Sequence, residues 1–467
     1  MIYRPPESES MWDTWLYQDG KDYHLFFLSG GGRIGRAVSQ NLIDFKHLPP
    51  IDNMAKADDW DESGMRMTGC TVKHQGKYYM SYGSGEGTPI GILVSSDLMN
   101  WERHPANPIL PSKTPYLIDT NWRDLSSYYD ATEKRWHGYL YATHRSGLPS
   151  IAHLTSHDYI QWDYLDPVFS SEAFVHMEVP DYFEMGGKHY LLFSSVRTRK
   201  ETSGRKDAGG AWYVISDRRD GPYHLLEAPL LLGFGRGRHD HYVGRTVAYN
   251  DKRLLYHHTW GSSVVTWGTP KVVHQNGDGT LALRYWSDLN ALETHTLLEQ
   301  DRVTCEAKEG QKAVRMLDVE AEDAMITFTL ELDTARCAGL FWRNQEMRPK
   351  GLGLIESGVG LTLDRKSDMV SVVNVERPKL FNATTVLCHL KDDYHEAGVA
   401  TGPQQVRILV RAHMAEVYIN ERWVFCIDIS DVPDSGNMGM LVESGSATIT
   451  NLRVAEIKPL EIAKIGA

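Results

Sequence analysis

A repeat with a period of 54 to 64 residues runs through the first 290 residues of this 467-residue chain. Each copy begins at a turn in which Gly, Asp or Glu stands near a lysine, and the turn leads into an aromatic-rich segment. The five lysines are Lys21, Lys77, Lys134, Lys188 and Lys252. A second marker follows in phase, and its copies begin at Ala37, Val94, Leu154 and, more weakly, Val214. Two markers that recur in phase with this period predict a repeated supersecondary unit.

The repeat unit has the pattern of an all-β chain. Short alternating segments punctuated by Gly, Asn, Asp and Pro dominate, and long amphipathic helical patterns are nearly lacking. Roughly 50 to 60 residues can hold four short strands, which is one blade of a β-propeller. The five copies therefore predict a five-bladed β-propeller over residues 1–290. A long sandwich with hairpins of similar length is the alternative, and the second marker argues against it.

The remainder of the chain has a different pattern. Residues 285–300 are the best helical candidate and are expected to connect two domains, with 291–300 as the linker. From residue 301 the repeat stops, while alternating apolar segments continue. Asn420 and Glu421 stand between two apolar runs and are typical of a hairpin turn. Residues 301–467 are therefore predicted to form a β-sandwich.

Charge and cysteine usage exclude several classes of protein. The net charge is −12 and no Lys/Arg run occurs, so a nucleic-acid partner is not expected. No stretch of 18 apolar residues and no signal-like apolar segment is found, so no membrane partner is expected. The chain has five cysteines, an odd number, without a CxxC spacing. This argues against a disulfide framework and a cysteine zinc site, and it favours a cytoplasmic location.

Acidic residues precede four of the five marker lysines. Asp13, Asp124, Glu178 and Asp240 lie 8, 10, 10 and 12 residues before their lysines, whereas blade two offers MTGC at positions 67–70. The innermost strand of each blade lines the propeller axis, so these acids are expected to converge there. Crowded carboxylates are costly unless they are used, because like charges disfavour ionisation and separate the pKa values.

Such a separation of pKa values is what glycoside hydrolysis requires. One carboxyl must donate a proton to the leaving oxygen, and another must be ionised to attack carbon or activate water. Glu178 is the candidate acid/base, because its arm is longer and the apolar Val179 and Phe183 nearby would raise its pKa. Asp13 is the candidate nucleophile. Asp124 follows Arg123, whose charge would keep it ionised to bind sugar hydroxyls.

Further residues are candidates for contacting a sugar. Arg123 and Asp240 would contribute hydrogen bonds, and tryptophans could stack on a sugar face, although blade packing is the alternative for each ring. The candidate platforms are Trp12, Trp15, Trp60 and Trp260. His239, His241, His257 and His258 fit no standard zinc spacing, and the last two are strand neighbours pointing to opposite faces. No metal and no organic cofactor are expected.

Several of these segments resemble glycoside hydrolase family 32, the β-fructosidases. The IGRAVSQNLIDFKHLPP segment at Ile34 is similar to the family's sequence after its first blade turn. WRDLS at Trp122 resembles its Arg-Asp-Pro motif, and MEVPDYFEMGGKHYLLFS at Met177 resembles its Glu-Cys-Pro-Asp motif. DHYVGRT at Asp240 is similar to its Asp-x-Tyr-Ala segment, and the C-terminal segments resemble its appended β-sandwich. The resemblance covers nearly the whole chain.

The resemblance implies a retaining double displacement, with Asp13 as nucleophile, Asp124 as transition-state stabiliser and Glu178 as acid/base. The chain departs from the family's first motif, Trp-x-Asn-Asp-Pro-Asn-Gly. Here it reads MWDTWLYQDG, closer to the Val-Trp-Asp-Ser-Trp of family 68, and Leu28 stands where Gln is expected. Leu125 and Val179 replace the family's Pro and Cys.

The sequence thus predicts a cytoplasmic retaining furanosidase that acts on a small carbohydrate, such as a short fructoside. Two alternatives stay open. One is an inverting furanosidase of the arabinanase type, in which the two carboxyls stand about 6.5–9.5 Å apart instead of about 5–5.5 Å. The other is a sugar-binding propeller without catalytic activity.

Overall fold

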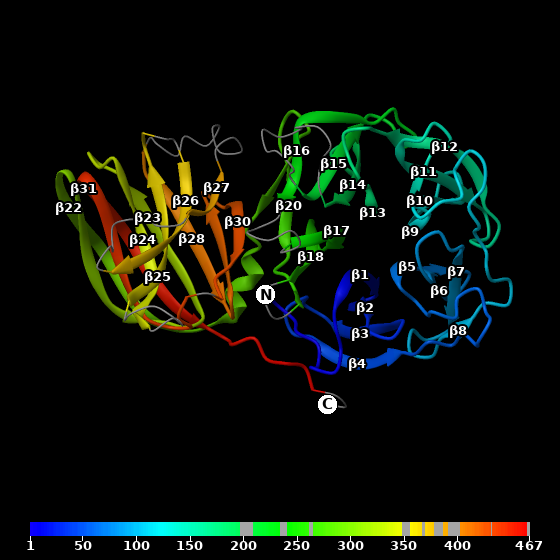
Figure 1. Cartoon of the computed structure of the whole chain (residues 1–467), viewed down its shortest axis with the longest axis horizontal. Helices are drawn as coiled ribbons and strands as arrows, with labels where there is room; N and C mark the ends of the chain where they lie inside the picture. Colours follow the sequence, from blue (N-terminus) through cyan, green and yellow to red (C-terminus); the bar gives the residue numbers. More distant parts are fainter. Residues whose placement is uncertain are drawn as a thin grey trace.

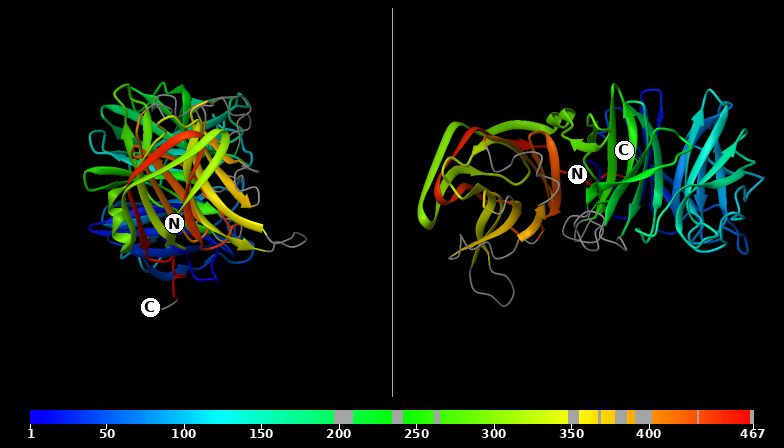
Figure 2. Two further views of the ribbon diagram at one scale, coloured as in Figure 1. Left: turned by 90° about the vertical axis from the view of Figure 1, so that its left-hand side faces the viewer. Right: turned by 90° about the horizontal axis from the view of Figure 1, so that it is seen from above.

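The computed structural model describes residues 1–196, 209–233, 241–260, 265–347, 355–366, 369–377, 386–390, 402–430 and 432–464. Two all-β bodies lie side by side, a ring of small sheets and a stack of longer strands (Figure 1). The view from above shows the same division, with the N-terminus between the bodies (Figure 2). Among the described residues, no helix combines the length and the apolar character needed to cross a membrane.

Four blades of the ring are separate antiparallel sheets of four strands in sequential order. Blade one comprises β1 (Trp12–Asp19), β2 (Asp22–Ser29), β3 (Arg33–Ser39) and β4 (Lys46–Ile51). Blade two comprises β5 (Met67–His74), β6 (Lys77–Gly83), β7 (Ile90–Ser95) and β8 (Glu102–Arg103). Blade three comprises β9 (Arg123–Asp130), β10 (Arg135–Thr143), β11 (Pro149–Ser156) and β12 (Asp163–Ser170). Blade four comprises β13 (Glu178–Met185), β14 (Lys188–Ser195), β15 (Gly210–Ser216) and β16 (His224–Gly233).

The fifth blade completes the predicted propeller and joins it to the second body. Its strands are β17 (His241–Tyr249), β18 (Lys252–Trp260), β20 (Lys271–Gln275) and β21 (Leu281–Arg284), and β19 (Val265–Trp267) pairs with the end of β18. Its outer strand β21 pairs with a strand of the second body through Arg284 and Arg422. The innermost strands β1, β5, β9, β13 and β17 surround the centre of the ring (Figure 1).

Both sequence markers correspond to turns. The lysine marker is the hairpin between the first two strands of each blade, as at Gly20, where φ is +59°. The second marker follows the third strand, where an Asx side chain closes the turn. Asp97 Oδ1 accepts the N–H groups of Met99 and Asn100 at 2.8 Å, and Asp158 repeats this arrangement one blade later. Because such turns depend only on local residues, the repeat could be read from the sequence.

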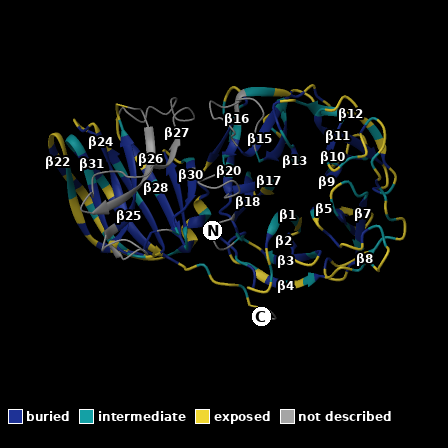
Figure 3. Ribbon diagram, viewed as in Figure 1, coloured by how far each residue is buried: buried dark blue, intermediate teal, exposed yellow. Residues whose placement is uncertain are grey.

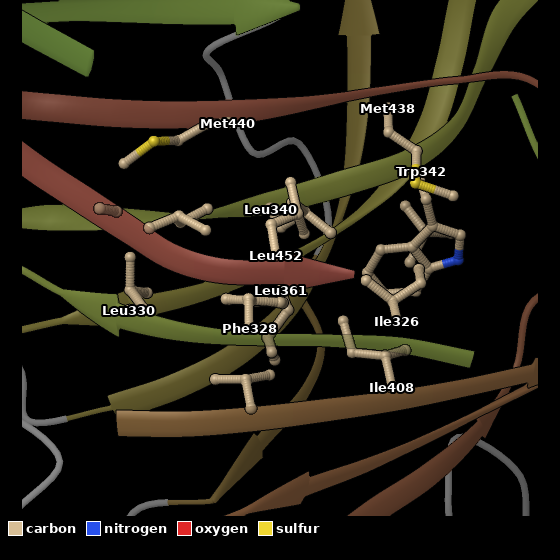
Figure 4. Close-up of a cluster of buried hydrophobic side chains, with 14 of the residues drawn as sticks. Ile326, Phe328, Leu330, Leu340, Trp342, Leu361, Ile408, Met438, Met440 and Leu452 are labelled. Carbon is tan, nitrogen blue, oxygen red and sulfur yellow. The ribbon is translucent and has the colours of Figure 1, made fainter. Parts of the chain in front are cut away.

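The second body is the predicted β-sandwich. Its strands are β22 (Glu293–Glu320), β23 (Ala324–Glu331), β24 (Cys337–Met347), β25 (Ile355–Asp364), β26 (Met369–Arg377), β27 (Val386–Leu390), β28 (Gln404–Arg411), β29 (Met414–Ile419), β30 (Arg422–Asp428) and β31 (Asn437–Ile457). The long strand β31 pairs with β22, β23 and β24. Phe328, Trp342, Ile408 and Leu452 belong to one buried cluster between the strands (Figure 4). Buried residues predominate in the inner strands of both bodies, whereas β22 at the edge of the sandwich is largely exposed (Figure 3).

The connector differs from its helical prediction. Only Ser287–Leu292 form a helix, a short 3-10 turn (η1), and β22 begins at Glu293. Leu289 and Leu292 anchor this turn in the core, and the chain then pairs with β31 instead of continuing as a helix. The predicted linker 291–300 thus falls on the end of η1 and the start of β22. The hairpin turn at Asn420 and Glu421 is confirmed, with φ angles of +51° and +64°.

Candidate active site

The innermost strand of every blade carries a β-bulge near its start, where two residues face one residue of the second strand. The first bulge residues are Asp13, Thr68, Asp124, Val179 and Val243. Four of them have positive φ angles, namely Asp13 (27°), Asp124 (63°), Val179 (50°) and Val243 (55°). Such a backbone costs about 1–3 kcal/mol per non-glycine residue, and bulges re-aim side chains beside functional sites. Four residues with a strained backbone thus surround the propeller axis.

The bulges show how the predicted carboxylates correspond. Asp13 and Asp124 occupy the same bulge position in blades one and three. Glu178 stands one residue before its bulge and therefore matches Trp12 and Arg123. The predicted equivalence thus holds for the two aspartates and is shifted by one residue for Glu178, because the count from the lysine crosses strands and turns of different length.

Hydrogen bonds from blades two and four hold Asp13 and Asp124, and Thr68 connects the two carboxylates. Thr68 Oγ1 donates to Asp13 Oδ2 at 2.5 Å, and the Thr68 N–H donates to Asp124 Oδ1 at 3.2 Å. The Val179 N–H donates to the other oxygen, Asp124 Oδ2, at 3.2 Å. Both carboxylates are therefore held in fixed orientations by the bulges of neighbouring blades.

Glu178 accepts hydrogen bonds on both of its oxygens. Arg123 Nη2 donates to Oε1 at 2.6 Å, and the Tyr242 hydroxyl donates to Oε2. Arg123 also donates to the Thr120 carbonyl at 2.7 Å and lies over the ring of Tyr141. Its Nε is 3.7 Å from Asp124 Oδ2, so its closer carboxylate partner is Glu178 and not, as expected, Asp124.

Burial dominates the electrostatics of the two aspartates. It raises the pKa of Asp13 to about 8, with a further contribution from the charge of Asp124, while the Thr68 hydrogen bond acts in the opposite direction. Burial also raises the pKa of Asp124 to about 6, against the lowering effect of Arg123. The sequence predicts that Arg123 favours the ionised form of Asp124, and the charge of Arg123 does lower the pKa of Asp124, but burial has the larger effect. The local sequence does not indicate this burial of the aspartates, which comes from the assembled blades.

The tryptophans occupy different environments. Trp12, at the first position of β1, is partly buried, and its ring centroid lies 5.1 Å from that of His258. Trp15 is only 1% exposed and donates to Thr71 Oγ1 at 3.1 Å, so its ring packs between blades one and two and offers no free face to a sugar. Trp60 is partly buried and stacks on Tyr82. We therefore retain Trp12 alone of these three as a candidate platform at the axis.

Two predicted contacts fall outside the described part of the structure. Asp240 is not among the described residues, and Trp260 is described only through its backbone at the end of β18. Their roles in substrate binding stay predictions.

Two residues at the site were missed from the sequence. Thr68 was missed because the search considered acidic residues and blade two offers none. Its hydroxyl and its N–H nevertheless connect two carboxylates by hydrogen bonds. Tyr242 stands within the DHYVGRT segment, two residues after the predicted Asp240. The segment was therefore visible as a motif, and its aromatic hydroxyl was the signal that could have pointed to Glu178.

A cluster of potential metal ligands lies away from the axis, on blades three and four. Within the described residues, its side chains approach to within 4.8 Å in two groups, His137 with His153 and Asp220, and Asp130 with Glu133 and His137. The Arg219 guanidinium contacts all three carboxylates of these groups. Since this cation already neutralises part of their charge and would repel a metal ion, we assign no metal to the cluster.

Known structures share this architecture over nearly their full length. A β-fructofuranosidase from Bombyx mori superimposes with a TM-score of 0.70 at 17% identity, over 98% of this chain and 93% of that one. The sucrose-6-phosphate hydrolase of Lactobacillus gasseri gives 0.69 at 14% identity, over 98% and 92%. A fructofuranosidase variant from Schwanniomyces occidentalis gives 0.68 at 11% identity, over 97% of both chains. These likenesses establish the fold.

The family follows from the sequence itself. Residues 13–255, a little over half of the chain, match the model of the glycosyl hydrolases family 32 N-terminal domain. The match begins at Asp13 and includes Asp124, Glu178 and Tyr242, the residues that meet at the axis. The chain therefore belongs to glycosyl hydrolase family 32, and it is a glycoside hydrolase.

Proposed function

We propose that the protein hydrolyses a short fructoside, or a related furanoside, by a retaining double displacement. Asp13 is the nucleophile, Glu178 the acid/base and Asp124 the stabiliser of the positively charged transition state. The observation that carries this proposal is the arrangement in which hydrogen bonds from Thr68 and Val179 hold the aspartates, while Arg123 holds Glu178 and lies 3.7 Å from Asp124.

The substrate class is supported by the family and by its structurally similar members. A variant of the Bombyx mori enzyme has been solved with sucrose, and the Schwanniomyces occidentalis enzyme with fructosylnystose. We extend a small fructose-containing substrate to this chain on that basis. The changed first motif supports a difference in how the furanose ring is held, because Leu28 pairs with Trp12 in the strand beside the site and offers no hydrogen-bonding group.

The proton count of the site suits this chemistry. At neutral pH the raised pKa keeps a proton on Asp13, while Asp124 is mostly ionised. A retaining reaction needs one such proton, located on the acid/base, and an ionised nucleophile. We propose that substrate binding moves the proton from Asp13 to Glu178. Asp13 then attacks the anomeric carbon while Glu178 protonates the leaving oxygen, and Glu178 later removes a proton from the hydrolytic water.

The other residues of the site bind and orient. Asp124, fixed by two backbone N–H groups, offers its carboxylate to sugar hydroxyls and to the developing charge. Arg123 and Tyr242 keep Glu178 in one rotamer, so that little reorganisation is needed during proton transfer. Trp12 offers a ring face near the axis.

We also place the enzyme in the cytoplasm. Cys70, Cys305 and Cys337 are buried free thiols, as is common in a reducing compartment. These thiols are packed in the interior without forming disulfides, so the fold does not require an oxidising compartment.

Replacing Asp13 by Asn and Glu178 by Gln tests the assignment. We expect each variant to lose about 10³-fold or more of kcat/KM on sucrose or short fructans while keeping its melting temperature within a few degrees. Glu184→Gln is the matched control, since Glu184 lies exposed on the same strand as Glu178 and should keep full activity. Near-normal activity of Asp13→Asn or Glu178→Gln would contradict the assignment.

The stereochemistry separates the proposal from its alternatives. NMR of the first-formed sugar should show the anomeric configuration of the substrate, and mass spectrometry after rapid quenching should find a sugar attached to Asp13. An inverted product without such an adduct would support the arabinanase type of reaction. Saturable binding without any turnover would support a sugar-binding propeller.

A further inference from the structure

Neighbouring residues at the start of β17 face two different parts of the molecule. The Tyr242 hydroxyl donates to Glu178 at the axis. His241 is fully buried on the opposite face, and its Nε2–H donates to the Cys426 carbonyl of the sandwich at 2.6 Å. The strand end that supplies the partner of the acid/base is therefore fastened to the second body.

The adjacent strand β18 repeats this division. The His258 ring lies near the site, with its centroid 5.1 Å from that of Trp12 and 6.2 Å from that of Tyr242. His257 faces the sandwich instead, and its ring centroid is 5.4 Å from that of His241. The predicted orientation of the two histidines to opposite faces is thus confirmed, and each face has its own set of contacts.

An ion pair lies behind His257. Lys271 of the propeller and Glu416 of the sandwich are in contact, and both side chains are completely buried. Lys271 Nζ also donates to the Thr269 carbonyl at 2.8 Å, and the Tyr418 hydroxyl donates to Glu416 at 3.0 Å. A buried pair is costly unless its remaining hydrogen-bonding capacity is met, and here it is met from both bodies.

Lys271 also fixes the state of His257. Its ammonium lies 3.0 Å from His257 Nε2, which must accept, so the proton is on Nδ1 and is donated to the His258 carbonyl at 3.0 Å. Burial and the charge of Lys271 lower the pKa of His257, which stays neutral. The ion pair thereby holds the backbone between the two histidines.

We propose that the sandwich positions the acid/base of the propeller. Glu416 acts through Lys271 and His257 on β18, and the Cys426 carbonyl acts through His241 on β17. Together they set the place of Tyr242 and thereby of the Glu178 carboxyl. This inference rests on the proposed role of Glu178, and it makes Glu416 and His241 positioning residues that do not contact the substrate.

The bulge in β17 explains why such support is needed. Val243, a β-branched residue, has a φ of +55° directly after Tyr242. This conformation is strained and persists only where the surroundings enforce it. The His241 contact on one side of Tyr242 and the Val179–Tyr242–Val243 cluster on the other provide that enforcement.

Leaving-group dependence tests the inference, because general-acid assistance matters for a poor leaving group and little for an activated one. The full-length variants are His241→Ala and the double variant Lys271→Met with Glu416→Leu, which replaces the ion pair by apolar groups. Both are assayed on sucrose and on 4-nitrophenyl β-fructofuranoside. We expect kcat/KM to fall about 10-fold on sucrose and less than about 3-fold on the aryl substrate. Tyr242→Phe should show the same selective loss.

Glu443→Gln is the matched control. Glu443 pairs with Arg336 at 2.6 Å within the sandwich, so its replacement should leave kcat/KM unchanged on both substrates. An equal loss on both substrates, or no loss in either His241→Ala or the double variant, would overturn the inference. Glu178→Gln distinguishes this failure from that of the proposed function, since it must itself show the selective loss on sucrose if Glu178 is the acid/base. If His241→Ala does not fold, the double variant decides.

Discussion

Two of the buried charged clusters in the described part of the chain differ in the balance of their charges. At the propeller axis, Asp13, Asp124 and Glu178 share the cation of Arg123, and burial raises the pKa of both aspartates. At the border with the sandwich, burial acts to raise the pKa of Glu416, but the charges of Lys271 and of the N-terminal ammonium and the hydrogen bonds from Lys271 and Thr269 together lower it. The same desolvation therefore produces a cluster poised to exchange a proton in one place and a permanent ion pair in the other.

The largest effect is expected from breaking the balanced cluster. Glu416→Ala leaves the Lys271 ammonium buried without its counter-ion, which should lower the free energy of unfolding by about 3–5 kcal/mol. Urea denaturation followed by tryptophan fluorescence measures this loss. The apolar double variant Lys271→Met with Glu416→Leu should be far less destabilised. Equal destabilisation of both variants would mean that volume, and not charge, governs the border.

Asp13→Asn removes one ionisable group from the cluster of carboxylates at the propeller axis, and it should stabilise the folded state. The pKa of Asp13 is raised from 3.8 to about 8, so the folded state binds the extra proton between these pH values, and stability falls as pH rises through that window. Asn removes this cost and should stabilise the fold roughly five times more at pH 7.5 than at pH 4.5. Thermal unfolding at the two pH values measures the difference, and a gain that is independent of pH would contradict it.

Arg123→Met should affect activity more than stability. Without the guanidinium, Glu178 loses one of its two donors and the three carboxylates lose their nearest cation. We expect kcat/KM to fall by about 10²-fold, as for other lost charge-assisted contacts in a site. Arg123→Lys should recover part of it, because a single ammonium cannot reproduce the fork that reaches both Glu178 and Thr120. Steady-state kinetics at several pH values provide the measurement.

The smallest effect is expected from an exposed pair. Lys73 lies 3.4 Å from Asp19, and their side chains are 46% and 37% exposed. Water and salt screen such a pair, so Lys73→Ala should leave the melting temperature and the activity unchanged within error. A clear loss would show that a charge does not have to be buried to matter in this protein.

Features that depend on local residues were predictable from the sequence. The hairpin glycines and the Asx turns of Asp97 and Asp158 each lie within a few residues of the strands that they connect, and so the repeat and the propeller could be recognised. The three carboxylates were found for the same reason, because each precedes such a turn by a similar number of residues.

Features that depend on contacts between blades were not predictable. Burial raises the pKa of Asp13 most, the charge of Asp124 raises it further and the Thr68 hydrogen bond lowers it, and both of these residues are more than 50 residues away along the chain. The partner of Arg123 could not be chosen without the bulge that shifts Glu178 by one position. Lys271 and Glu416 lie in different bodies, and no pattern in either segment indicates the other.

The shared sheet has a consequence for any attempt to divide this protein. β21 is the outer edge of the fifth blade, and its contact with β30 covers backbone groups that an isolated propeller would present to solvent. Trp286 and Leu289 also belong to one apolar cluster with Leu409 and Tyr418 of the sandwich. A fragment ending near residue 300 would expose both an unprotected strand and an apolar surface, the two features that promote aggregation. We therefore expect the propeller without the sandwich to aggregate.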